Sequence, residues 1–143
     1  MPRPLVHAAT CTGLAVVAYA LTRRRDVVPS IYATGLFVDA DHLVDFSIYK
    51  TTKQRRGILP LHGWEHATLG WVLAARSSWH PVVLFAALSY TIHLTLDQIF
   101  NYPAQWPGYF LTFRALNGFN RQGFDVQGGQ MHHWFELPPW QWL

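Results

Sequence analysis

Three features of the 143-residue sequence predict an all-α fold: an antiparallel four-helix membrane bundle with an aromatic-rich, irregular C-terminal tail. Half of the residues are hydrophobic and only 13% are charged, against about 25% in an ordinary soluble domain. Long apolar segments alternate with short basic or Pro- and Gly-containing links. Many of the Trp, Tyr and Phe residues lie near the C-terminus, as in the aromatic belts of membrane boundaries. An aromatic-rich soluble core is the alternative, which the shortage of charge disfavours.

No change in composition marks a second domain, so residues 1–143 are expected to form one membrane-embedded domain. Its helical core spans about 4–100, and an interfacial tail spans about 101–143. The helices are expected at 5–21, 27–49, 61–76 and 81–100. Arg23 to Arg25 stop the first, and Pro29 suits the first turn of the second. The fourth is the best spanning candidate, because about 20 residues follow Pro81. One short helix is expected in the tail, at 109–116.

The net charge of +3 does not indicate nucleic-acid binding. The bases form two clusters, 23–25 and 50–56, and each follows a hydrophobic segment. Such juxtamembrane clusters set topology and contact anionic lipid headgroups, and no nucleic-acid recognition module accompanies them. Membrane lipids are therefore the expected partners. The single cysteine, Cys11, cannot form an internal disulfide and is expected to be a small buried residue.

An unusual cluster of ionisable residues lies in the second predicted helix, Asp39-Ala-Asp41-His42-Leu-Val-Asp45. A charge in an apolar helix is tolerated only when it is paired, solvated or bound to a metal. Each other predicted helix also carries ionisable residues near one of its ends: His7; His62, Glu65 and His66; His93 and Asp97. In an antiparallel bundle these positions all fall at the same end. The sequence therefore predicts one shared site.

The spacing within this set indicates metal binding. His62 and His66 are four residues apart, as are His93 and Asp97, so each pair shares a helix face. Imidazole and carboxylate are ligands of Zn²⁺ and related divalent ions. The predicted ligands are His7, Asp41, His42, His62, His66, His93 and Asp97, a set too large for one tetrahedral ion.

The remaining ionisable residues have other expected roles. Glu65 or Asp39 is the candidate general base. Asp45 either caps the helix or pairs with Lys50 or Lys53. A surface role is favoured for the two tail histidines, His132 and His133.

The order of these motifs resembles that of the bacterial inner-membrane-bound metal-dependent hydrolases. The matching residues are His7, Asp39-Ala-Asp41-His42, His62 with the preceding Arg56-Gly57, and His93-Leu-Thr-Leu-Asp97. The likeness covers about residues 5–100. Family members often read His-Arg-Gly, a short gap and Thr-His-Ser, whereas here the gap is longer and no Ser or Thr flanks the histidine. The family histidine thus corresponds to His62 or to His66. The resemblance implies a metal-dependent hydrolase of the inner membrane.

Two functions of different classes are consistent with these features. In the first, a metal-activated water attacks a phosphoester or lipid-linked substrate, and Lys53, Arg55 and Arg56 attract anionic headgroups. In the second, the chain is a small accessory membrane subunit with a structural metal or polar core, and its aromatic tail binds protein partners. A metal transporter is less favoured, because the chain has no internal repeat for alternating access. Counting bases, with Arg114 and Arg121 among them, favours a cytoplasmic site end.

Overall fold

The computed structural model describes residues 4–54, 56–100 and 106–120, and in these residues every regular element is a helix. The all-α prediction is thus confirmed for this part of the chain. Most of the predicted tail, with His132 and His133, lies outside the described residues. The α-helices and 3₁₀ helices (η) are α1 (Pro4–Thr22), α2 (Val27–Gly35), η1 (Phe37–Asp41), α3 (His42–Thr52), α4 (Trp64–Arg76), α5 (Pro81–Phe100), η2 (Trp106–Tyr109) and α6 (Leu111–Leu116).

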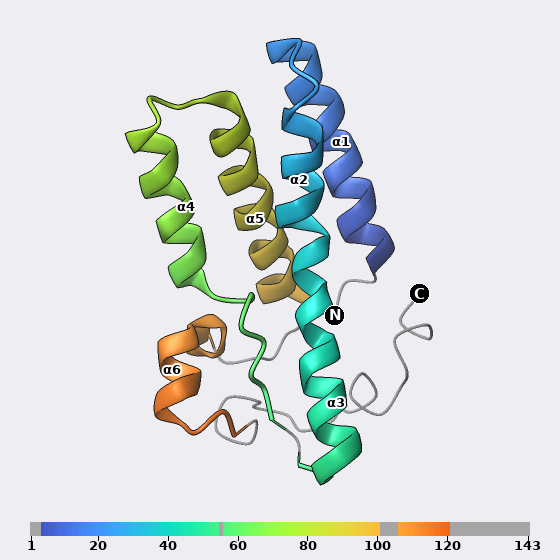
Figure 1. The fold of residues 1–143 in the computed structure, drawn as a ribbon, viewed down its shortest axis with the longest axis vertical. Coiled ribbons are helices and arrows are strands. Elements are labelled where there is room, and N and C mark those ends of the chain that lie inside the picture. The colour runs from blue at the N-terminus through green and yellow to red at the C-terminus, as the bar shows by residue number, and fades with distance from the viewer. Residues whose placement is uncertain (1–3, 55, 101–105, 121–143) are drawn as a thin grey trace.

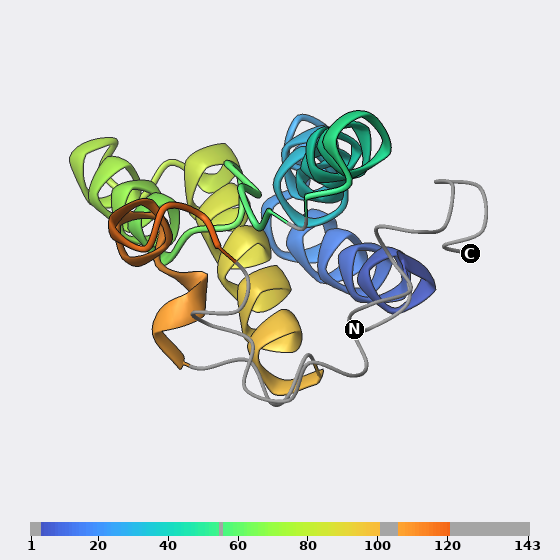
Figure 2. The ribbon, with the colours of Figure 1, turned by 90° about the horizontal axis from the view of Figure 1, so that it is seen from below.

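Four helices, α1, α2, α4 and α5, run alternately up and down in Figure 1. The central pair is α2 and α5, with α1 packed against α2 and α4 against α5, as the end view in Figure 2 shows. One stripe of α1 faces this packing: His7, Cys11, Ala15 and Ala18 recur every three or four residues and are all buried. His7 therefore points inward for the same reason that the apolar residues do.

The first and fourth predicted helices are confirmed almost to the residue. Arg23 ends α1 in the left-handed conformation, with φ of 58°, and its N–H donates to the Tyr19 carbonyl at 2.8 Å. Pro81 begins α5, where a missing N–H costs nothing. The third predicted helix begins at Trp64 rather than at residue 61, because Gly63 is extended, with φ of −142° and ψ of 132°. His62 thus lies in the preceding link.

The prediction of one continuous helix over 27–49 is wrong. Leu36, with φ of −128° and ψ of −47°, interrupts it, and the 3₁₀ helix η1 separates α2 from α3. Directly before this break Gly35 is closely packed, since an added Cβ would lie 2.2 Å from Ser89 Oγ and 2.6 Å from Cys11 Sγ. Beyond this point α3 continues past the end of the bundle (Figure 1).

In the part of the chain that the structure describes, two helices, α1 and α5, are long and apolar enough to cross a membrane by length and composition. The outer face of α1 exposes large apolar side chains, among them Leu5, Val16 and Leu21. Leu69 and Leu73 do the same on α4. The expected helix in the tail is present as α6, and the 3₁₀ helix η2 precedes it.

Candidate metal centre

Six ionisable side chains from four parts of the chain meet inside the bundle: His7, Asp39, His42, His62, His93 and Asp97. The start of α1, the α2–α3 junction, the link before α4 and the second half of α5 converge at the lower end of the bundle in Figure 1. Five of the side chains are exposed by 3% or less, and Asp39 by 18%. The meeting of ionisable side chains at one end of the bundle, which the antiparallel order predicts, is therefore present.

One group of potential ligands consists of His7, Asp39, His93 and Asp97, whose ligand atoms lie within 4.8 Å of one another. Asp97 stands at its centre, because its Oδ1 lies 3.3 Å from His7 Nε2 and its Oδ2 lies 3.3 Å from His93 Nε2. His93 and Asp97 are one helical turn apart on α5, as their spacing predicts. The rings of His7 and His93 are neighbours, with centroids 4.2 Å apart.

A second group consists of Asp39, His42 and His62. Asp39 Oδ1 lies 3.7 Å from His42 Nε2 and 3.3 Å from His62 Nε2. The 3₁₀ turn brings Asp39 and His42 to the same side, because a 3₁₀ helix has three residues per turn and residues three apart are therefore aligned. The same oxygen is also 3.5 Å from His93 Nε2, in the first group. Asp39 is thus the member that both groups share.

Hydrogen bonds on the outer side orient two of the rings. His93 Nδ1 lies 3.0 Å from the Gly35 carbonyl, which can only accept, so Nδ1 carries the proton. His62 Nδ1 donates in the same way to the Asp41 carboxylate at 3.0 Å. In the neutral ring each Nε2 then points inward with a lone pair, the orientation that outer partners give to metal-binding histidines. The two Nε2 atoms lie only 3.0 Å apart, a separation that a positive charge between them would stabilise.

The polar atoms of the cluster are poorly satisfied by one another. In the described residues, hydrogen-bond partners are lacking for both ring nitrogens of His7, both carboxylate oxygens of Asp97 and Oδ1 of Asp39, although several lie 3.3 Å from a neighbour. Unpaired buried carboxylates cost several kcal/mol each. A cation would satisfy His7 Nε2 together with the carboxylates of Asp39 and Asp97. The cluster therefore fits a divalent metal with imidazole and carboxylate ligands.

The pKa values of two histidines agree with this. Burial alone would lower the pKa of His62, but contacts with Asp39, Asp41 and Asp97 raise it well above its ordinary value, so this point attracts positive charge. Burial, with repulsion from His62, lowers the pKa of His42 to about 4. Its ring therefore stays neutral, the form that binds a metal.

Two expected ligands lie outside both groups. Asp41 is on the far side of His62, where its Oδ2 also accepts the N–H of Leu61 at 2.8 Å. Its place in the cluster is taken by Asp39, which the sequence favoured as a base or supporting carboxylate. His66 Nε2 lies 2.8 Å from the Pro60 carbonyl. Of the two candidate histidines on this segment, only His62 reaches the cluster.

Glu65, the other candidate base, faces α6. Its Oε2 accepts the N–H of Leu111 at 3.0 Å, and its Oε1 accepts the N–H and hydroxyl of Thr112 at 2.9 and 2.7 Å. Burial is the largest single influence and raises the pKa of Glu65, but these hydrogen bonds together outweigh it and lower the pKa to about 2. Glu65 thus holds a helix in place. Asp45, for which a cap or a lysine partner was expected, is buried and accepts the N–H of Ile58 at 3.0 Å.

No match to the chain is found among protein-family models, curated proteins or solved structures. The resemblance to the inner-membrane hydrolases stays a prediction from the order of the motifs.

Sequence reasoning missed three residues that support the cluster. Gly35 supplies the carbonyl that orients His93. Tyr90 donates its hydroxyl to the Leu61 carbonyl and accepts the N–H of Gly63 at 3.1 Å, which fixes the link on both sides of His62. Arg114, counted above as a base of the site end, is only 1% exposed. No local pattern in the sequence distinguishes these residues, because their partners are distant in the chain.

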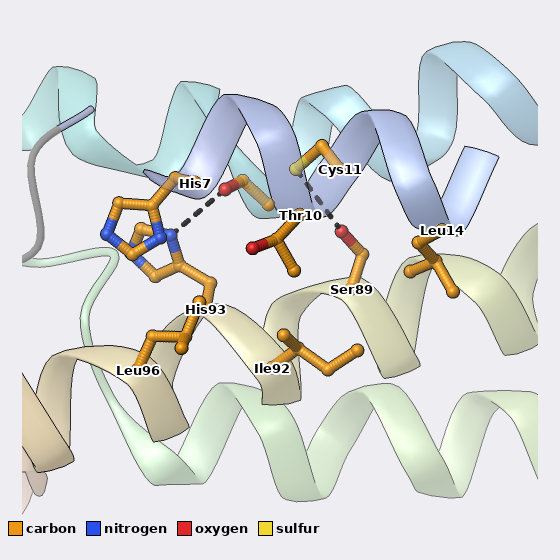
Figure 3. A pocket seen from close by; sticks show the side chains of 9 residues that line it. His7, Thr10, Cys11, Leu14, Ser89, Ile92, His93 and Leu96 are labelled. Atoms are coloured by element: carbon orange, nitrogen blue, oxygen red, sulfur yellow. Dashed lines mark hydrogen bonds between the residues drawn. The ribbon is translucent and has the colours of Figure 1, made fainter. Parts of the chain in front are cut away.

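A small cavity between α1 and α5 borders the cluster (Figure 3). His7 and His93 close one end of it, and Thr10, Leu14 and Ile92 are among the residues that line the rest. Its volume is about 10 Å³, which is room for a single water molecule. The hydroxyl of Ser89 donates to the Ile31 carbonyl at 2.8 Å and that of Thr10 to the Val6 carbonyl at 2.8 Å. Both hydroxyls thus bond to backbone carbonyls, so the cavity is mostly apolar.

Proposed function

We propose that the protein is a membrane-bound hydrolase that uses two divalent metal ions to cleave a phosphoester or a lipid-linked substrate. One observation carries the proposal: Asp39 belongs to two groups of buried histidine and aspartate side chains at once. Hydrolytic two-metal sites hold their ions about 3.5–4 Å apart, and Asp39 is the residue that would be available to both ions.

Each group would hold one ion. His7, His93 and Asp97 with Asp39 offer four ligands for the first, and His42 and His62 with Asp39 offer three for the second. Zn²⁺ is the first candidate because the donors are imidazole and carboxylate. When bound, the ions would supply a water that is deprotonated near neutral pH and would polarise the bond to be cleaved. Asp41 and the Gly35 carbonyl keep the rings of His62 and His93 in the required orientation.

The exposure of the cluster suggests where a substrate arrives. Asp39 is its most exposed member, at 18%, whereas His62 is exposed by 1% and Asp97 not at all. A reacting group would therefore approach beside Asp39. The other ligands lie in a dry environment, where charges interact more strongly than in water.

The proposed setting is a multi-pass bundle in the bacterial inner membrane. The two candidate spans, α1 and α5, and the apolar side chains exposed on α1 and α4 support it. The cluster would then lie near one membrane face. Lys50 and Lys53, both exposed, lie where α3 ends beyond this part of the bundle. Such bases favour the cytoplasmic side and attract anionic headgroups, which suits a lipid-linked or phosphorylated substrate.

Metal analysis of the purified protein in detergent tests the proposal. Wild-type protein is expected to hold two equivalents of metal and to hydrolyse bis(p-nitrophenyl) phosphate. Asp39→Asn should lose affinity for both ions and His93→Ala for the first, and both should lose hydrolysis. Asp26→Asn is the matched control, because Asp26 is half-exposed and pairs with Arg24 at the opposite end of the bundle. A wild-type protein that holds no more than one equivalent of metal would refute the proposal.

A second candidate is an accessory membrane subunit with a structural metal site. The near-complete burial of His7, His62, His93 and Asp97 favours it, since structural sites are closed whereas catalytic sites keep an open position. This candidate predicts metal without hydrolysis, and unfolding when a chelator removes the metal. The enzyme predicts a chelated protein that stays folded and regains hydrolysis when metal is restored.

A further inference from the structure

A buried guanidinium lies beside the metal centre. Arg114, on α6, is 1% exposed, and its Nη2 donates to the carbonyl of His62. In the described residues its Nε has no hydrogen-bond partner. Burial lowers the pKa of Arg114, which the carboxylates of Asp41 and Asp45 oppose. Burying a charged side chain is costly unless its surroundings compensate for it, so this position needs an explanation that a surface arginine would not.

The contact of Arg114 with His62 is one of several that fasten α6 to the link carrying that histidine. Glu65, just after His62, accepts hydrogen bonds from Leu111 and Thr112 at the start of α6. Before His62, Arg56 Nη1 donates to the Gly118 carbonyl at 2.7 Å. The N–H of Gly57 also donates to the Phe119 carbonyl at 3.0 Å. The link is therefore held to the α6 region on both sides of His62.

His62 depends on these contacts because it is outside a helix. The extended Gly63 separates His62 from α4, so the backbone of His62 takes no part in the helical hydrogen bonds of α4. Its N–H donates to the Leu59 carbonyl at 3.0 Å, its ring is held by Asp41, and its carbonyl is held by Arg114. Removing Arg114 would leave that buried carbonyl unsatisfied and free the backbone that positions the ring.

The other group of ligands has a different support. His7, His93 and Asp97 lie within α1 and α5, where regular helical hydrogen bonds and the packing of the bundle fix their backbones. The ring of His93 is oriented by the Gly35 carbonyl of α2. Arg114 contacts the cluster through its hydrogen bond to the His62 carbonyl. The backbones of the two groups are therefore held by separate parts of the fold, although the His62 ring touches the first group: its Nε2 lies 3.3 Å from Asp97 Oδ2 and 3.0 Å from His93 Nε2.

We propose that Arg114 is a positioning residue for one of the two metal ions: it fixes His62 in the Asp39–His42–His62 group, whereas the backbones of His7, His93 and Asp97 in the other group do not depend on it. The inference rests on the proposed two-ion centre. It makes α6, outside the four helices of the bundle, a part needed to complete the second site. Changes to an outer partner of a metal ligand typically cost about 10- to 100-fold in metal affinity.

The test measures Co²⁺ binding to the chelated full-length protein in detergent, by stoichiometry and by the visible absorption of the bound ion. Arg114→Met keeps the unbranched stem and removes the guanidinium, and Arg76→Met, at the exposed end of α4, is the matched control. Wild-type protein and Arg76→Met are expected to bind two equivalents. In Arg114→Met one equivalent should bind as in the wild type, while the other weakens by about 10- to 100-fold. The absorption contributed by that ion should weaken with it.

Arg114→Lys keeps the charge but not the planar fork, and it is expected to fall between wild type and Arg114→Met. If Arg114→Met does not fold, the test uses Arg114→Lys alone. In that case, a second equivalent of Co²⁺ that binds Arg114→Lys as tightly as it binds the wild-type protein overturns the inference. Two wild-type equivalents in a folded Arg114→Met, or equal weakening of both, also overturn it while leaving the two-ion centre intact. If the wild-type protein binds no Co²⁺, the proposed function itself fails.

Discussion

Replacing Gly35 with alanine should disturb both the packing of the bundle and the metal centre. The added Cβ would lie 2.2 Å from Ser89 Oγ and 2.6 Å from Cys11 Sγ, so both side chains must turn away. Ser89 then loses its 2.8 Å hydrogen bond to the Ile31 carbonyl, worth about 1 kcal/mol. Overpacking adds about 1–3 kcal/mol. Since alanine favours a helix over glycine by up to about 1 kcal/mol, the expected net loss of stability is about 1–3 kcal/mol.

Denaturant unfolding of the chelated protein in detergent, followed by far-UV circular dichroism, measures this loss. Gly13→Ala is the matched control, because Gly13 is exposed in α1 and no atom lies within 4 Å of its added Cβ. It should be neutral or slightly stabilising. Adding Cys11→Ala and Ser89→Ala to Gly35→Ala removes both clashing atoms and should recover part of the loss. A Gly35→Ala protein as stable as Gly13→Ala would refute the packing argument.

Two further predictions concern residues near the cluster. Glu65 has a pKa of about 2 instead of its ordinary 4.5, so its stabilising effect is complete above about pH 4.5 and is lost as the pH falls towards 2. The stability difference between metal-free wild type and Glu65→Gln should therefore shrink between pH 5 and pH 2, and a constant difference would contradict this. His66→Ala should retain two equivalents of metal, whereas His62→Ala should lose the second, because His66 contacts the Pro60 carbonyl instead of the cluster. Metal analysis of both variants checks this, and loss of metal from His66→Ala alone would contradict it.

The parts of the fold that follow from local sequence were predictable. An apolar run bounded by arginines specifies α1, and a proline followed by about 20 mostly apolar residues specifies α5. The meeting of the ionisable residues also followed from sequence, since it needs only the direction of each helix and the end at which its polar residues lie. Neither inference depends on the details of side-chain packing.

The exact ligand set was not predictable, because it depends on packing between distant residues. Asp39 and Asp41 both lie in the 3₁₀ helix that follows the break after Gly35, and Gly35 packs closely against Cys11 and Ser89 on other helices. In one continuous helix the two carboxylates would point about 200° apart, but nothing local says which of them faces the core. The partner of Glu65 is 47 residues away, at Thr112, and that of Arg114 is 52 residues away. Contacts of this range leave no periodic signal.

The 3₁₀ helix η1 has a consequence for how the centre opens. Its five residues, Phe37–Asp41, include the carboxylate that both groups share. Hydrogen bonds in 3₁₀ turns are poorly aligned, and segments with few regular hydrogen bonds open before the global unfolding of a protein. Amide protons in η1 should thus exchange with deuterium sooner than those in the middle of α2 or α5. Metal that binds only the ordered turn would slow that exchange, so the ions would help to fold the very turn that holds them.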